Sequence, residues 1–353
     1  NTFTLPLDLN YEIDLWGRAR RISESALALA DAGDAAYHNI LLGVQADVAR
    51  TWFSLRALDA ERDLVARNVQ SRRRSLEIVS RRYALGATGR LDTSLAETEL
   101  ATAESSLVEI DQNRAALRHA LAVLCGQLPE TFDLPPPSPL LAPPLPPPPA
   151  IPLGLPSELL ERRPDIATAE RTLASASAQI GVAKAAFFPA ITLFGSAGYA
   201  SNTTGTLLDW SSREWSIGPG ITLPLFQGGR NTANYRRAQA AYDEALANYR
   251  QNVLTAFQEV ETTLSDLRRL AERSAILDRA VVSSRRAADL VLERYRAGQI
   301  GYLDVTDSER TAIANERLAV QVRGRQLISS VLLIKALGGG WDHTPSPPPP
   351  PDS

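Results

Sequence analysis

Few side chains in this sequence are spaced for catalysis or metal binding. The histidines, His38, His119 and His343, are far apart and share no metal-ligand spacing. Cys125 is the one cysteine and can form no disulfide within the chain. Its place after residues 121–124 predicts a buried structural thiol rather than a nucleophile. Because no nucleophile and base form a recognisable constellation, we expect no enzyme activity, no cofactor and no metal site.

Charged residues at helical spacing form a second class of candidates. Asp307 and Arg310 are three positions apart, so on a helix they face the same side. Such a pair on a helix surface is usually only solvated. The arginines at 72–74, with Arg81 and Arg82, are likewise interpreted as a solvated helix face, and a contact with a partner protein is the alternative. Spacing alone gives none of these charges a role.

The composition argues against nucleic acid as a partner. Charged residues make up 22% of the chain and the formal net charge is -3, so no basic field attracts nucleic acid or an anionic membrane surface. Aromatic residues are only 6%, and the abundant alanine suits long, closely packed helices. No apolar run approaches the roughly 18 to 20 residues of a membrane helix, so any membrane crossing must use strands.

An internal repeat with an offset of 212 residues organises the chain. Residues 67–97 align with residues 279–309 without a gap, and the register extends to both sides. One supersecondary unit therefore occurs twice. Identical pairs include Arg67/Arg279, Val69/Val281, Ser71/Ser283, Arg73/Arg285, Arg82/Arg294, Tyr83/Tyr295, Gly86/Gly298, Gly89/Gly301, Leu91/Leu303, Asp92/Asp304 and Glu97/Glu309, and farther out Gly17/Gly229, Leu55/Leu267 and Gly126/Gly338.

The repeated unit is predicted to be a strand followed by a helical hairpin. Residues 17–85 contain no proline, and their apolar positions advance by three and four in turn, as in a coiled coil. A helix of that length reaches about 100 Å. Gly86 and Gly89 then turn the chain into a shorter helix. The first repeat (1–133) is predicted to contain a strand at 3–15 and helices at 17–85 and 91–126, and the second (157–341) a helix at 157–188, strands at 190–200 and 214–226, and helices at 229–297 and 303–337.

Proline-rich segments follow each repeat. Residues 134–156 are interpreted as an extended connector and residues 342–353 as a tail, because proline neither continues a helix nor donates to a strand ladder. Both are interpreted as spacers in preference to peptide-recognition motifs.

The predicted strands alternate between an apolar and a polar face. Each has nearly the length of a tilted membrane strand, about 9 to 11 residues, although the edge of a soluble sandwich alternates in the same way. Three strands cannot close a barrel, so several chains must contribute to one sheet. Since each strand continues into or out of a long helix, the helices are expected to extend the same cylinder.

Several segments resemble a known family. They are YEIDLWGR at 11–18 and LPLFQGGR at 223–230, at the strand-to-helix junctions, together with RRPDI at 162–166, FFP at 187–189 and KALGGGW at 335–341. Over essentially the whole chain the sequence is similar to the outer-membrane factor family, the TolC-like ducts of tripartite efflux pumps, and most similar to its lipoprotein drug-efflux (RND-type) branch. The resemblance implies a mainly α fold with a membrane β-barrel portion, in which three chains form one α/β tunnel.

The resemblance implies an outer-membrane channel that passively carries drugs or other small molecules from the periplasm to the outside, a function linked to antibiotic resistance. The implied partners are two further copies in a homotrimer, a periplasmic adaptor (membrane fusion protein), an inner-membrane transporter and outer-membrane lipid. The implied location is the outer membrane of a Gram-negative bacterium, with a periplasmic extension. The alternatives are the exit duct of a type I secretion system and a non-channel coiled-coil periplasmic scaffold or adaptor.

Two groups of site residues are predicted, the first from the resemblance and the second from the expected barrel. Asp304 and Asp307 match the family's acidic ring at the periplasmic gate, Arg310 its ion-pair partner and Tyr295 its constricting tyrosine. The first repeat has Asp92, Leu95 and Thr98 instead, which assigns the gate to the second hairpin. The aromatic belts at the two membrane interfaces are expected to include Trp16, Tyr199, Trp210 and Trp215, although Trp210 could equally pack within an external loop at 201–213.

The family pattern also bears on the start of the chain. The sequence has no methionine and opens at Asn1 in a patterned strand. By that pattern the first repeat lacks an opening helix and a first strand, and a signal peptide and an acylated cysteine are expected to precede them. We expect these 353 residues alone not to form a stable trimeric pore.

Overall fold

The computed structural model describes residues 1–134 and 162–340 and divides into two compact units. One unit contains Asn1–Asn39 and Arg163–Thr255, and the other contains Ile40–Arg162 and Ala256–Trp341. The predicted connector beyond residue 134, the start of the helix predicted at 157, Trp341, His343 and the tail lie outside the described residues.

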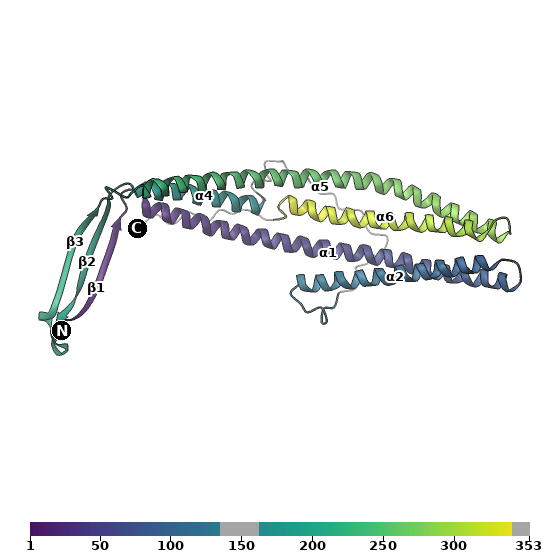
Figure 1. Ribbon diagram of the computed structural model, residues 1–353, viewed down its shortest axis with the longest axis horizontal. Coiled ribbons are helices and arrows are strands. Elements are labelled where there is room, and N and C mark those ends of the chain that lie inside the picture. The colour runs from purple at the N-terminus through teal and green to yellow at the C-terminus, as the bar shows by residue number, and fades with distance from the viewer. Residues whose placement is uncertain (135–161, 341–353) are drawn as a thin grey trace. The chain divides into compact units, whose positions relative to one another are not determined.

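Three antiparallel strands form the sheet of the first unit (Figure 1). β1 (Phe3–Ile13) and β3 (Arg213–Thr222) pair with opposite sides of β2 (Ala190–Ser201). Because side chains alternate along a strand, the apolar residues of β1 and β3 share one face, and polar or small residues occupy the other. That apolar face is open in the protomer, where Leu7 is 77% and Trp215 is 78% exposed.

Two strands end earlier than predicted, at Ile13 rather than 15 and at Thr222 rather than 226. After β1, the carboxylate of Asp14 accepts two backbone N–H groups in the first turn of α1 (Arg18–Ala84), at 2.9 and 3.0 Å. It therefore acts as a helix cap instead of a strand residue. After β3, Pro224 has no N–H to donate to a ladder.

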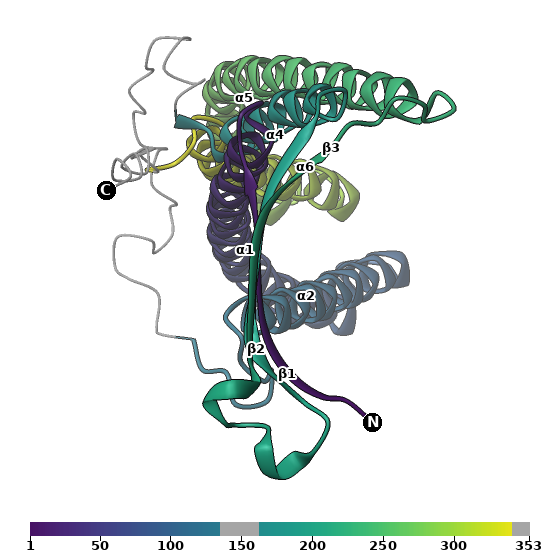
Figure 2. The same cartoon turned by 90° about the vertical axis from the view of Figure 1, so that its left-hand side faces the viewer.

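A shorter helix, α4 (Pro164–Ala185), lies between the beginnings of α1 and α5 (Arg230–Arg296) in the first unit (Figure 2). The hydroxyl groups of Ser25 on α1 and Ser175 on α4 are 2.8 Å apart, and Gln179 donates to Ser25 at 2.8 Å. The buried contact between Ser25 and Ser175 is between small side chains, so α1 and α4 can approach closely there. α4 ends before the predicted residue 188, since the two residues before Pro189 form a turn.

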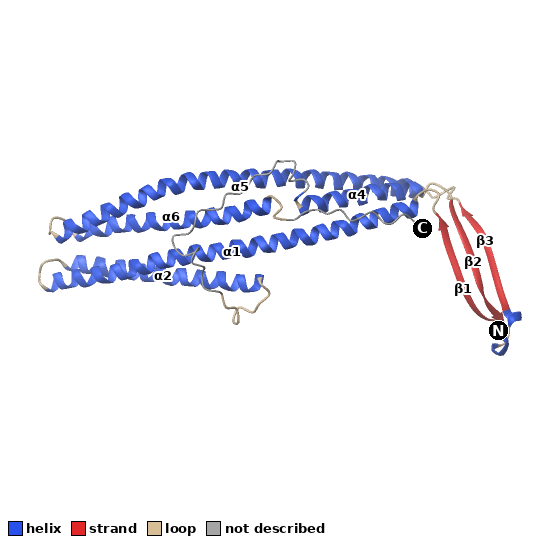
Figure 3. Ribbon diagram, turned by 180° about the vertical axis from the view of Figure 1, so that it is seen from behind, coloured by secondary structure: helices blue, strands red, loops and turns tan. Residues whose placement is uncertain are grey.

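Each repeat contributes one helical hairpin to the second unit (Figure 3). α1 and α5 both have 67 residues, and α2 (Arg90–Leu124) and α6 (Tyr302–Ala336) both have 35. Gly86 and Gly298 end the long helices with φ angles of 72° and 73°. The N–H that follows each glycine reaches back to the carbonyl of Arg82 or Arg294, at 2.8 and 3.0 Å. Both hairpins therefore use the same glycine-dependent helix termination, so the sequence repeat is also a repeat of backbone geometry.

α6 also runs antiparallel to α1, which joins the two hairpins within the second unit. The coiled-coil spacing in α1 predicted the face that packs within its hairpin. The buried surface of α1 is wider than this, because α6 of the other hairpin covers it as well. Three contacts mark the part that α6 covers, starting from the hairpin turns: Arg72 with Glu309, Glu61 with Arg317, and Ala57 with Gly324.

Two further observations concern the helices. Cys125 is exposed at the end of α2, so the prediction of a buried thiol is wrong. Leu121 and Ala122 occupy the buried positions one turn earlier, and the helix ends before its buried face returns at Cys125. Among the described residues, no helix is both long and apolar enough to cross a membrane.

Candidate functional site

The first turns of α6 have one exposed and one buried face. Gly301, in an extended conformation, precedes the helix, and Asp304 lies in the first turn. Because the exposed positions are separated by three or four residues, they lie together on one side of α6. The buried positions are Tyr302, Val305 and Thr306, and the exposed ones are Leu303, Asp304, Asp307 and Arg310. The structure thus brings together three of the four predicted gate residues.

Tyr295, the fourth predicted gate residue, lies elsewhere. It is 5% exposed and packs in a core with Val79, Ala96, Tyr302 and Val305, which together come from α1, α2, α5 and α6. The Tyr295 and Tyr302 ring centroids are 5.5 Å apart. In this conformation Tyr295 supports the helix that carries the aspartates and does not project beside them.

Arg82 of α1 holds Tyr295 from the first hairpin. Its guanidinium lies 4.8 Å from the centre of the Tyr295 ring, and it donates a hydrogen bond to the Tyr295 carbonyl oxygen at 3.3 Å. Burial raises the pKa of the Tyr295 hydroxyl, an effect that the nearby Arg82 charge opposes. The phenol is therefore neutral at physiological pH, and its ring serves as a packing and cation–π surface.

Arg310 is bound more closely by the first hairpin than by its neighbour on α6. Its Nε donates to Oε1 of Glu99 on α2 at 2.8 Å, and a second guanidinium nitrogen pairs with the same oxygen. The carboxylate of Asp307 is 3.7 Å away. The hydrogen bond to Glu99 raises the pKa of Arg310. The expected partner on the same helix is thus secondary.

Arg72 corrects the interpretation of the arginine run at 72–74. Its side chain is 3% exposed and lies between Glu99 and Glu309. It therefore does not belong to a solvated face, because α6 covers it. Sequence reasoning did not identify Glu99 as a partner of Arg72. Two signals were available: Arg72 continues the three-and-four spacing of the long helix, and the repeat equivalents of Glu99 and Arg72, Thr311 and Ser284, are uncharged.

Trp16, one of the predicted interfacial aromatics, lies where the sheet meets the helices. Its ring stacks on Phe188 with centroids 4.7 Å apart, and its Nε1 donates to the carbonyl oxygen of Pro189 at 2.7 Å. A half-exposed ring with its polar atom satisfied suits a boundary between lipid and water.

The other three predicted aromatics lie at the opposite end of the strands, roughly 30 Å away at about 3.3 Å per residue. Tyr199 pairs in register with Leu5 and Arg213, and Trp215 lies two residues farther along β3 on the same apolar face. Trp210 is 76% exposed in the loop, with the Arg213 guanidinium over its ring. Trp210 therefore packs against another residue of its loop, and its place at a membrane interface stays a prediction.

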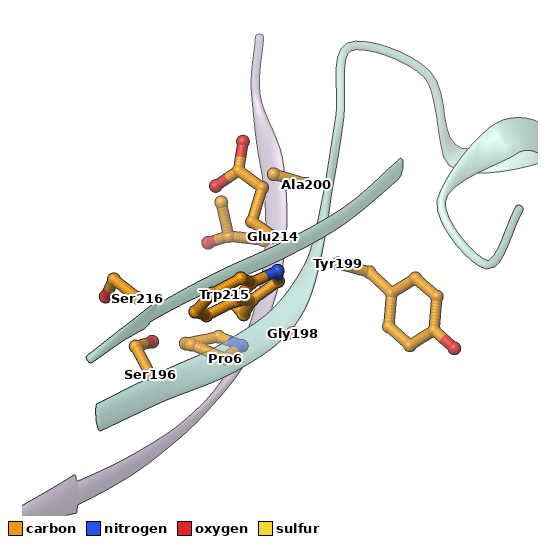
Figure 4. A pocket seen from close by; sticks show the side chains of 9 residues that line it. Pro6, Ser196, Gly198, Tyr199, Ala200, Glu214, Trp215 and Ser216 are labelled. Carbon is orange, nitrogen blue, oxygen red and sulfur yellow. The ribbon is translucent and has the colours of Figure 1, made fainter. Parts of the chain in front are cut away.

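The polar face of the sheet carries a shallow hollow of about 290 Å³ near the loop end (Figure 4). Small side chains leave this space, and Glu214 supplies its one carboxylate, while Tyr199 points away (Figure 4). Within the described residues no three metal-ligating side chains come together. A shallow hollow of this kind is better suited to contact with water than to the binding of a specific ligand.

Comparison with known proteins gives a consistent result. A family model described as outer membrane efflux protein matches residues 1–127 and 155–339. Outer membrane protein OprJ of Pseudomonas aeruginosa is 36% identical over 335 residues, which cover 94% of this chain and 69% of OprJ. The toluene efflux pump outer membrane protein TtgF of Pseudomonas putida is 35% identical over 343 residues, covering 97% of this chain and 70% of TtgF.

Solved structures extend the similarity to the fold. The outer-membrane channel OprN has a TM-score of 0.90 and 34% identity, covering 96% of this chain and 76% of its own. VceC of Vibrio cholerae has a TM-score of 0.88 and 30% identity, covering 96% and 80%. The similarity confirms the predicted TolC-like fold class, and the likeness to the channel OprN favours a channel over a coiled-coil scaffold or adaptor.

Proposed function

The chain belongs to the outer membrane efflux protein family, the outer-membrane channels of efflux pumps, and we propose that it acts there as a passive duct closed at its second helical hairpin. Its location is the outer membrane of Gram-negative bacteria. The observation that carries the proposed closure point is the exposed acidic face at the start of α6, immediately after the hairpin turn.

We further propose that the working channel is a homotrimer that receives its cargo from a periplasmic adaptor and an inner-membrane transporter. The open apolar face of the sheet supports contact with lipid, and the outer edges of β1 and β3 support pairing with neighbouring copies, since unpaired edges are costly in lipid. Relatives named for toluene and solvent efflux support small organic molecules as cargo.

The proposed gate works by electrostatics. Three copies of Asp304 and Asp307 around a threefold axis bring carboxylates of like charge together, which attracts cations and excludes anions. Arg310 lies on the same face and offsets part of this charge. Its bond to Glu99 keeps the arginine to one side, which leaves the two aspartates as the dominant charges of the face.

Conductance of the assembled channel in planar lipid bilayers tests this gate. The Asp304→Ala/Asp307→Ala variant is expected to lose cation preference and to change its resting conductance by roughly twofold or more, because the carboxylates that hold cations at the aperture are gone. The control is Asp289→Ala, which removes an exposed aspartate from the same hairpin, on α5. Unchanged selectivity and unchanged closure in the double variant would contradict the proposed gate.

A further inference from the structure

Four charged side chains from three helices come together next to the proposed gate, near the start of α6. Arg72 of α1, Glu99 of α2, and Glu309 and Arg310 of α6 form what we call the four-charge cluster. The side chains of Arg72 and Glu99 are 3% and 8% exposed, and Glu309 is 15% exposed. Arg310 is the one largely exposed member, at 56%.

The contacts form a chain with two bridging residues. Arg72 uses Nη1 to bind Glu309 at 2.7 Å and Nη2 to bind Glu99 at 3.3 Å. Glu99 gives its other oxygen to Arg310. Two cations therefore balance two carboxylates. The two ends of this series of ion pairs, Glu309 and Arg310, are adjacent residues of α6. The ion pairs of the cluster thus join α1, α2 and the start of α6 to one another.

The internal repeat shows that the cluster is specific to the contact between the hairpins. The repeat equivalents of Arg72 and Glu99 are Ser284 and Thr311, and the first-repeat equivalent of Arg310 is Thr98. Glu309 does have a charged equivalent, Glu97, but that residue is exposed. Copying one hairpin would not have produced this cluster, since each repeat supplies one arginine and one glutamate at positions that do not correspond.

Burial makes this arrangement sensitive to the loss of a member. A buried ion pair contributes little net stability, but removing one partner leaves an uncompensated charge in a medium of low dielectric. Loss of Arg72 would leave Glu99 and Glu309 with Arg310 as the cluster's remaining cation. The two carboxylates would then repel each other across the contact between α2 and α6.

We propose that Arg72 is a positioning residue of the channel: through Glu99 and Glu309 it holds the start of α6, with the acidic face, against the first hairpin. Its effect on conductance rests on the proposed gate. The restraint acts within one protomer and opposes movement of α6 relative to α1 and α2. Opening the duct at this end requires α6 to move with the first hairpin or the cluster to break.

Three variants of the assembled channel test the proposal. Arg72→Met removes the bridge. Arg72→Met/Glu309→Gln removes it without leaving a surplus buried carboxylate, so this variant folds even where the single variant does not. The matched control is Arg73→Ala, which removes the adjacent arginine, whose pair with Glu104 joins α1 to α2 at 2.7 Å and is largely exposed.

The first measurement is hydrogen exchange of the backbone amides at 302–312, followed by mass spectrometry. We expect exchange on the order of tenfold faster in the double variant than in the wild type, and no change in the control. The unfolding temperature of the double variant should stay near the wild-type value, which separates positioning from general stability. Unchanged exchange at 302–312 would overturn the proposal, whatever the conductance.

Conductance of the same proteins separates this proposal from the gate. Faster exchange together with a higher resting conductance in the double variant supports both the positioning role of Arg72 and the proposed gate. Faster exchange with unchanged conductance supports the role of Arg72 and contradicts the gate at Asp304 and Asp307, since α6 would then move without effect on the aperture.

Discussion

Burial raises the pKa of Glu309 above its ordinary value of 4.5, although Arg72 lies 2.7 Å from its carboxylate. Arg72 and Arg285 lower this pKa and Glu99 raises it, but the loss of solvation is the largest effect. A carboxyl group whose pKa is higher in the folded than in the unfolded state favours folding most when it is protonated. Its contribution is fully present below the unfolded pKa and is lost as the pH rises through the folded pKa.

Replacing Glu309 with glutamine should remove this dependence. We expect the unfolding temperature of the wild type, measured relative to that of Glu309→Gln, to rise as the pH falls from about 8 to about 4. The comparison cancels the titration of all other carboxylates. A difference between the two proteins that stays constant over this range would show that Glu309 titrates normally.

At the residue scale, the sequence predicted that the aspartates share one helix face, but not which residues of the other hairpin lie beside that face. Asp304, Asp307 and Arg310 lie within two turns of one helix, so their common face follows from helical periodicity. Glu99 lies far from Arg310 in the sequence, and only the packing of α6 on the first hairpin joins them. Neither spacing nor composition contains that information.

At the element scale, a glycine sets the distance between α6 and α1. A Cβ atom built at Gly324 would lie 2.5 Å from the Cβ of Ala57, closer than two carbon atoms can pack. Glycine is unfavourable in a helix by about 1 kcal/mol relative to alanine. Its presence in the middle of α6 is therefore explained by the close approach of the two helices.

The Gly324→Ala substitution has two opposing effects on the free energy of unfolding. The gain in helix propensity is about 1 kcal/mol, whereas overpacking costs about 1 to 3 kcal/mol, so we expect a net loss of up to about 2 kcal/mol. Gly33→Ala is the control, since nothing lies within 4 Å of the position of its Cβ, and it should be neutral or stabilising. Denaturant unfolding measures both; a gain in stability in both variants would mean that α6 and α1 are not in close contact.

How closely the predicted boundaries of the helices and strands match the structure depended on which residues terminate each element. The helices of both hairpins begin and end within two residues of the predicted positions, because glycines terminate them in both repeats. β1 was predicted too long, since Asp14 continues the alternating pattern yet caps a helix. The wider buried surface of α1 depends on a third helix, which periodicity within one helix does not reveal.

At the scale of the whole molecule, the fold class was predictable because independent features agreed. The repeat, the long helices and the alternating strands each allow several folds, but an outer-membrane tunnel accommodates all three. The junction motifs then identified the family. The contact between the two hairpins, on which the proposed gate depends, required the structure.

The most direct test of the duct is the conductance of the full-length wild-type protein that contains this chain, purified from the outer membrane and placed in a planar bilayer between unequal KCl solutions. We predict discrete conductance steps and a reversal potential that shows cation preference, because the proposed aperture is lined by carboxylates. A conductance no greater than that of the lipid alone, or a preference for chloride, would contradict this account.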